Sequence, residues 1–126
     1  MAEDLKRSEI LRRRKDLTRV LRFGHRIPPK AGTRQERLPL VLCYCRQVNP
    51  STPETPTRRI AFLLSYDLLS SVRRNRLKRL LREIYRRNKK VFPEHYDYAL
   101  LVGDPCYMLD HQKLKAETLR LASMVS

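Results

Sequence analysis

The sequence predicts an α+β fold, a two-layer α/β sandwich in which helices pack on a small mixed sheet. Three segments, RLPLVLCYCRQ, RRIAFLLSY and YALLVGDP, are apolar in the manner of strands, and three others have helical periodicity. They alternate as helix, strand, strand, helix, strand and helix. The 126 residues suffice for one domain but not for two, and 41% are apolar, which supports a globular core. We therefore expect one domain over residues 1–126, in which residues 1–14 are basic and flexible.

The first helix is predicted in DLTRVLRFG. Asp16 can cap its N-terminus and Gly24 can end it. Its apolar face is formed by Leu17, Val20 and Leu21. The following segment, HRIPPKAGTRQE, contains two prolines and a glycine, so we expect a loop that begins with a short edge strand.

The first long strand, RLPLVLCYCRQ, contains two of the three cysteines. Cys43 and Cys45 are two residues apart, so they point to the same face of the sheet, where we expect small core residues. An odd number of cysteines argues against a disulfide framework. The three histidines do not fall at a zinc-like spacing from this pair, so a metal site is not expected.

The remaining elements follow from turn residues and caps. VNPSTPETPT carries three prolines and predicts an exposed connection, whereas RRIAFLLSY predicts a strand that is covered on both faces. Residues 67–71 turn the chain, and Ser70 or Ser71 can cap a long basic helix that ends before Pro93. Asp110 can cap a last helix. The apolar stripe of that helix is Leu114, Leu119, Leu121, Ala122 and Val125.

Positive charge is concentrated in one segment. The chain has 28 basic and 13 acidic residues, a net charge of +15, and residues 72–90 hold ten Lys or Arg and one Glu. Such charge repels itself unless a polyanion neutralises it, which favours a nucleic-acid partner over a membrane surface. No apolar run approaches the roughly 20 residues that span a bilayer. Because the start is not a secretory signal, we expect a cytoplasmic location.

The basic helix is amphipathic. Leucines and one isoleucine form a single stripe, with Tyr85 at its edge, and the opposite side carries polar and basic residues. Glu83 lies four residues from both Arg79 and Arg87, so we expect it to hold these two side chains. Arginine is well suited to bind phosphate, because its planar guanidinium group can donate two hydrogen bonds to phosphate oxygens. The alternative is a solvated helix face, but such faces usually mix charges of both signs.

The order of residues in this helix is informative as well. Residues 72–83 read VxRNRxKRLxRE, which resembles the signature helix of the bacterial ribonuclease P protein subunit family. LRRRKDLTRVLRFGHR and YDYALLVGDP resemble its first segment and last strand, so the resemblance covers about Leu11 to Val125. It implies a known fold, a ribosomal protein S5 domain 2-like sandwich whose signature helix enters by a left-handed crossover.

The resemblance also implies a role. The ribonuclease P holoenzyme removes the 5′ leader of precursor tRNA, its catalytic centre is RNA with Mg²⁺, and the protein helps to bind the leader and the catalytic RNA. The protein itself would then supply no catalytic residue, no metal ligand and no bound cofactor. From the residues alone, we also find no paired carboxylates, no nucleophile with a base and no metal cluster among the basic residues.

Two sets of residues are expected to touch RNA. The catalytic RNA would contact Arg74, Asn75, Arg76, Lys78, Arg79, Arg82 and Arg86. A cleft for the leader would be lined by Arg12, Arg13, Arg14, Lys15, Leu17, Leu21, Cys43 and Tyr44.

The chain departs from the family pattern on the leader side. Tyr66 and Asp67 stand where two lysines are usual, and Leu17, Leu21 and Cys43 stand where aromatic rings are usual. We therefore expect leader binding to be mostly electrostatic, with Tyr44 and Phe23 as the remaining candidates for stacking. Two alternatives stay open: a ribosomal-type structural RNA-binding protein without a role in tRNA cleavage, and a protein-only nuclease, which would need a cluster of acidic residues that hold a metal.

Overall fold

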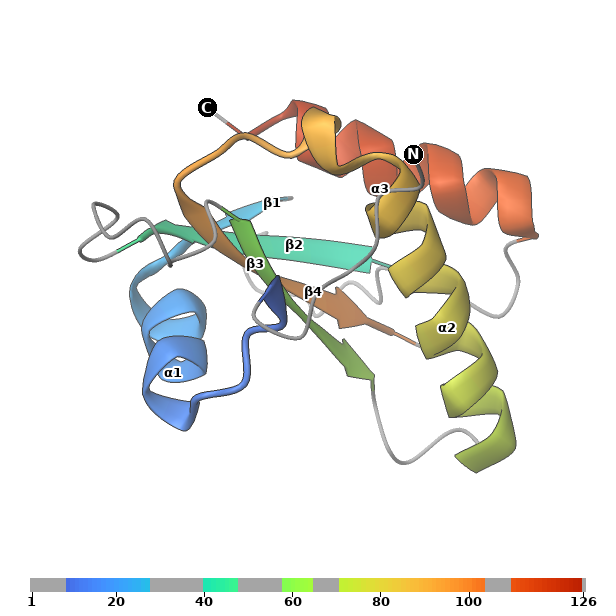
Figure 1. The fold of residues 1–126 in the computed structure, drawn as a ribbon, viewed down its shortest axis with the longest axis horizontal. Helices are drawn as coiled ribbons and strands as arrows, with labels where there is room; N and C mark the ends of the chain where they lie inside the picture. The colour runs from blue at the N-terminus through green and yellow to red at the C-terminus, as the bar shows by residue number, and fades with distance from the viewer. Residues whose placement is uncertain (1–8, 28–39, 48–57, 65–70, 104–109, 126) are drawn as a thin grey trace, which may run out of the picture.

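The computed structural model describes residues 9–27, 40–47, 58–64, 71–103 and 110–125. The predicted order of long strands and helices is confirmed, and the short edge strand is present (Figure 1). The elements are α1 (Arg14–Phe23), β1 (His25–Ile27), β2 (Leu40–Arg46), β3 (Arg58–Leu64), α2 (Ser71–Arg87), the 3₁₀ turn η2 (Lys89–Val91), β4 (Tyr96–Val102) and α3 (His111–Ser123). Residues 28–36 of the expected loop, the connection at 48–57, and residues 67–70 of the expected turn, with Ser70 as a candidate cap, lie outside the described residues.

The four strands form one mixed sheet in the order β1-β2-β4-β3. β1 and β4 are antiparallel to β2, and β3 is parallel to β4, so α2 connects two parallel neighbours. The predicted α+β fold with a small mixed sheet is therefore confirmed. Cys43 pairs with Ala99, which in turn pairs with Ala61, so three small side chains lie side by side on one face.

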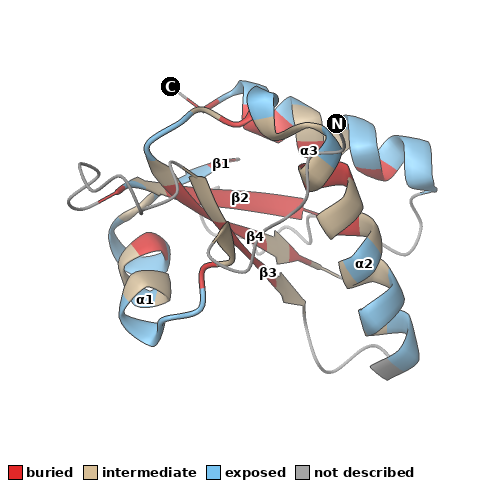
Figure 2. Ribbon diagram, viewed as in Figure 1, coloured by how far each residue is buried: buried red, intermediate tan, exposed pale blue. Residues whose placement is uncertain are grey.

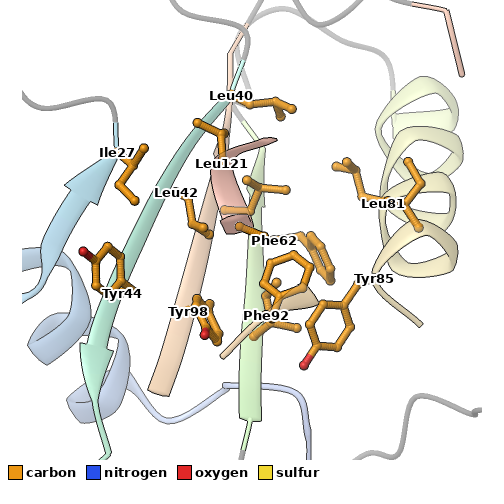
Figure 3. Packing of buried hydrophobic residues seen from close by; sticks show 14 of the residues in the cluster. Ile27, Leu40, Leu42, Tyr44, Phe62, Leu81, Tyr85, Phe92, Tyr98 and Leu121 are labelled. Carbon is orange, nitrogen blue, oxygen red and sulfur yellow. The ribbon is translucent and has the colours of Figure 1, made fainter. Parts of the chain in front are cut away.

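The larger hydrophobic core lies on the face covered by α2 and α3 (Figure 2). Its centre is aromatic, and Phe92 lies 5.0 Å from the Tyr85 ring and 5.4 Å from the Tyr98 ring (Figure 3). The Tyr98 hydroxyl donates a hydrogen bond to the Pro93 carbonyl at 2.5 Å. This core fixes the orientation of α2 on the sheet, because Leu81 and Ile84 of α2 belong to it.

A smaller core lies on the opposite face of the sheet, where α1 packs on β2 and β4. α1 can approach closely because the residues beneath it are small. Gly24 ends this helix against β2, since a Cβ there would lie 2.3 Å from the Val20 oxygen and 2.6 Å from the Tyr44 oxygen. Cys43 and Cys45 share this face, as predicted. The helix α1 therefore forms a third, partial layer, in addition to the sheet and the layer of helices that the sequence predicted.

Two local predictions differ from the structure. Asp16 does not cap α1, because the helix begins earlier and Arg13 occupies the cap without a side-chain hydrogen bond. Asp16 lies in the first turn instead, where a carboxylate also favours the helix. In the segment expected to be flexible, Leu11 is 2% exposed and its N–H donates to the Ile60 carbonyl at 2.9 Å. The described part of this segment is therefore docked on β3.

Candidate nucleic-acid interface

The basic helix α2 is anchored by its apolar stripe. Leu81, Ile84 and Tyr85 are buried in the larger core, and Leu77 and Leu80 pack against it partly buried. The predicted stripe is therefore confirmed, with Tyr85 as a full member rather than at its edge. Beyond Arg87, the Asn88 side chain donates to the Ile84 carbonyl at 2.7 Å, which satisfies one of the last carbonyls of the helix.

The other side of α2 faces solvent and is almost entirely positive. Its N-terminal half extends past the edge of the sheet, and exposed residues dominate it (Figure 2). Glu83 is the single acidic residue of the helix. The exposed polar and basic side chains are Arg73, Asn75, Arg76, Arg79 and Arg87, and the half-buried basic ones are Arg74, Lys78, Arg82 and Arg86. All seven residues expected to contact the catalytic RNA thus lie on this one helix and reach its surface.

Glu83 holds two arginines, but not the predicted pair. It accepts hydrogen bonds from Arg86 Nε at 3.0 Å and Nη2 at 2.5 Å, and from Arg87 Nε at 2.8 Å. These bonds, with that from Arg86 as the largest cause, lower the pKa of Glu83 from its ordinary 4.5 to about 2. Arg79, which we expected Glu83 to hold, has no ion-pair partner in the part of the chain that the structure describes. Its charge is therefore available to an anion.

Arg82 is held differently from its neighbours. Its Nε is buried and has no hydrogen-bond partner, while its side chain as a whole is half-buried. No carboxylate within the described ranges forms an ion pair with it. Packing rather than an acid therefore fixes this guanidinium, and its positive charge remains uncompensated.

The residues expected to line a leader cleft do not all lie together. Leu17 and Cys43 belong to the α1 face of the sheet, where Cys43 is 4% exposed, and Leu21 on the same helix is 44% exposed. Tyr44 lies on the opposite face, 5.2 Å from His25 and 5.7 Å from Tyr96 between ring centroids. Because neighbouring residues of a strand alternate between faces, Tyr44 cannot share a surface with Cys43.

The basic residues around the start of α1 are open to solvent. Arg12, Arg13, Arg14 and Lys15 are all exposed. They adjoin the face of the sheet that carries Leu17 and Cys43, away from the face that α2 covers. The structure therefore separates two positive surfaces, one on α2 and one at the start of α1.

A buried ion-pair cluster, which the sequence did not reveal, fastens α1 to the sheet. Asp97 is 0% exposed and accepts hydrogen bonds from Arg59 Nε at 2.9 Å, from Gln47 Nε2 at 3.1 Å and from Arg19. The hydrogen bond to Asp97 is the main cause that raises the pKa of Arg59. The sequence offered one signal of this cluster, an acidic residue inside an apolar strand. The partners of Asp97 could not be predicted, because they are far away in sequence.

Two further features of the described residues bear on the kind of site. No three His, Cys, Asp or Glu side chains there come together in a way that could hold a metal ion. Within the same residues, no helix has the length and apolar character needed to cross a membrane.

The fold and this surface define a small α+β domain whose longest helix presents an arginine-rich face. The family model described as Ribonuclease P matches residues 5–126. The chain therefore belongs to the ribonuclease P protein family, as its RNR helix indicated. This result does not favour the ribosomal-type alternative.

Curated relatives and solved structures agree with the family. The ribonuclease P protein components of Pelotomaculum thermopropionicum and Natranaerobius thermophilus are both 41% identical over 63 residues, 50% of this chain. These matches span 56% and 55% of the relatives, little more than half of their length. The RNase P protein from Thermotoga maritima aligns over 94% of this chain and 98% of its own, with a TM-score of 0.71 and 23% identity. The Staphylococcus aureus RNase P protein gives a TM-score of 0.67 at 19% identity, covering 90% of this chain and 91% of its own. Both structures share the fold.

Proposed function

We propose that this chain is the protein subunit of ribonuclease P and assists the endonucleolytic removal of the 5′ leader from precursor tRNA. It binds the catalytic RNA through α2 and the leader on the α1 side of the sheet. Hydrolysis is carried out by the RNA subunit with Mg²⁺, and the protein alone is inactive. Family membership supports this role, and a cytoplasmic location accords with it.

The observation that carries the proposal is the outer surface of α2. Arg76 and Arg79 are exposed, Glu83 is occupied by Arg86 and Arg87, and the buried stripe holds the helix rigidly on the sheet. Because the helix that carries these side chains is already packed on the sheet, no backbone has to be ordered when their guanidinium groups bind phosphate bidentately. A folded RNA presents many phosphates along such a surface, so affinity is expected to be high at low salt.

The chain's part in the reaction is to bind and to position RNA. Arginine and lysine side chains neutralise phosphates, which allows two RNA molecules to approach each other. Leu17, Leu21 and Cys43 lack rings and cannot stack on bases, so the leader is held on this side mainly by the exposed charges of residues 12–15. Tyr44 does not contribute to this leader-binding surface, because it lies on the face of the sheet that α2 and α3 cover.

Reconstitution with a ribonuclease P RNA tests the proposal. At low Mg²⁺, where the RNA alone cleaves poorly, adding the chain should raise the rate of precursor-tRNA cleavage. The chain without RNA should give no cleavage at any Mg²⁺ concentration. Robust Mg²⁺-dependent cleavage by RNA-free protein would overturn the assignment of catalysis to RNA. Failure to bind or stimulate the catalytic RNA would overturn the proposal itself.

A further inference from the structure

The chain segment before α1 is attached to the end of α2. Lys89, the first residue of η2, forms an ion pair with Glu9, in which Nζ lies 2.9 Å from Oε2 and donates a hydrogen bond of 3.1 Å to Oε1. The two side chains are only 15% and 13% exposed, whereas ion pairs that contribute little to a fold are those in full contact with solvent. Glu9 therefore ties the start of the described chain to the turn that follows the basic helix.

Backbone contacts continue this attachment across β3, the outer strand of the sheet. Ile10 forms a parallel bridge with Ile60, and the N–H of Leu11 donates to the Ile60 carbonyl at 2.9 Å. The Leu11 side chain is buried in the smaller core, on the face that α1 covers. Residues 9–11 therefore connect the end of α2 with the start of α1, and so join the two positive surfaces of the molecule.

Arg12 depends on these contacts for its position. It is exposed and lies outside α1, and the neighbouring Leu11 is held on β3. Lys15, by contrast, lies within α1, which Asp97 fastens to the sheet through Arg19. Releasing residues 9–11 would keep the charge of Arg12 but free its backbone, which then has to be ordered again when RNA binds, at a cost in affinity.

We propose that Glu9 and Lys89 are positioning residues of the ribonuclease P reaction, whose ion pair holds Arg12 at a fixed place relative to α2. This inference rests on the proposed function, in which α2 binds the catalytic RNA and the start of α1 faces the precursor. A precursor bound at one surface has to be aligned with a catalytic RNA bound at the other, and a fixed geometry achieves this without further loss of entropy. An acidic residue, which by itself repels RNA, raises the affinity of the chain for RNA in this way.

The sign of a mutational effect separates positioning from charge. Removing an acidic residue from an RNA-binding protein normally strengthens binding, because it increases the net positive charge. Glu9→Ala should instead weaken the binding of precursor tRNA to the reconstituted holoenzyme by roughly 2- to 20-fold, within the range of coupling between neighbouring groups. The matched control is Glu117→Ala, which likewise removes the partner of a basic residue, Arg120 on α3, and should not weaken precursor binding. Unchanged or tighter precursor binding by Glu9→Ala would overturn the inference.

A double-mutant cycle tests whether Glu9 acts through Arg12. In a chain that already carries Arg12→Ala, Glu9→Ala should cause little further loss of precursor affinity, because the positioned group is gone. In a chain that carries Lys15→Ala, the loss caused by Glu9→Ala should persist in full, because α1 holds Lys15. Equal losses in the two backgrounds would show a general loss of structure and overturn the inference.

The partner residue and a conservative variant complete the test. Lys89→Gln should weaken precursor binding as Glu9→Ala does, and the two changes together should cost no more than either alone, because they break the same pair. Glu9→Gln keeps an oxygen that can accept from Lys89, so it should restore part of the affinity. If the unaltered chain stimulates cleavage but Glu9→Ala binds precursor normally, this inference fails while the proposed function stands.

Discussion

At the scale of single residues, the replacement of Asp97 is expected to lower the unfolding free energy most. Asp97→Asn would remove the buried carboxylate that Arg19 and Arg59 share and leave these side chains, which are about four-fifths buried, with only the more distant Asp16 carboxylate. Breaking a buried ion pair in this way costs about 3–5 kcal/mol of unfolding free energy, measurable by urea denaturation. Asp110→Asn is the control, since asparagine also caps helices and should leave stability nearly unchanged. Equal stability of both variants would show that the Asp97 cluster contributes nothing net.

Arg79 is the residue whose loss should weaken RNA binding without disturbing the fold. Arg79→Ala removes an exposed guanidinium that has no ion-pair partner among the described residues, so binding to the catalytic RNA should weaken by roughly 1–3 kcal/mol. Unfolding free energy should stay within about 0.5 kcal/mol, as is usual for surface sites. Arg120→Ala on α3, where Glu117 already pairs with the arginine, is the control in the same filter-binding assay. Unchanged affinity of Arg79→Ala would mean that α2 is a solvated face.

At the scale of helices and strands, the sequence predicted what depends on local periodicity. The α2 stripe and the shared face of Cys43 and Cys45 follow from the repeat of a helix and of a strand, and the Asp110 cap follows from the residue type at the start of a helix. Which arginines pair with Glu83 could not be predicted from spacing alone. Helical side chains lean toward the N-terminus, so Arg86 and Arg87 reach back to Glu83 while Arg79 leans away from it.

The Glu83 contacts make the end of α2 sensitive to acid. Its pKa is lower in the folded chain, about 2 against an ordinary 4.5, so these contacts stabilise the protein fully above pH 4.5. The stabilisation is lost as the pH falls from 4.5 through 2. Glu83→Gln cannot titrate and should lack this component. Thermal unfolding midpoints of the two proteins should therefore differ at neutral pH and converge toward pH 2. A constant difference over that range would contradict the assigned pairing.

At the scale of the whole molecule, long-range contacts were beyond sequence reasoning. Asp97 bonds Arg19, 78 residues away, and Arg59, 38 residues away, and no local pattern relates these positions. Likewise, α1 could be recognised as a helix, but its placement on the face opposite to α2 depends on the order of strands in the sheet. That placement is what separates the basic residues into two surfaces.

Two surfaces on opposite faces should respond to salt independently. Each phosphate contact releases counterions, so the logarithm of RNA affinity should fall with the logarithm of salt concentration by roughly 0.7 to 0.9 per contact. Arg12→Ala with Arg13→Ala should reduce this slope for precursor-tRNA binding to the holoenzyme by about two contacts. The slope for assembly of the protein with the catalytic RNA should not change, because these residues adjoin the α1 face. Arg76→Ala with Arg79→Ala on α2 should show the reverse pattern. If either double variant lowers both slopes equally, one RNA covers both surfaces, and the division of the molecule into a catalytic-RNA side and a leader side is wrong.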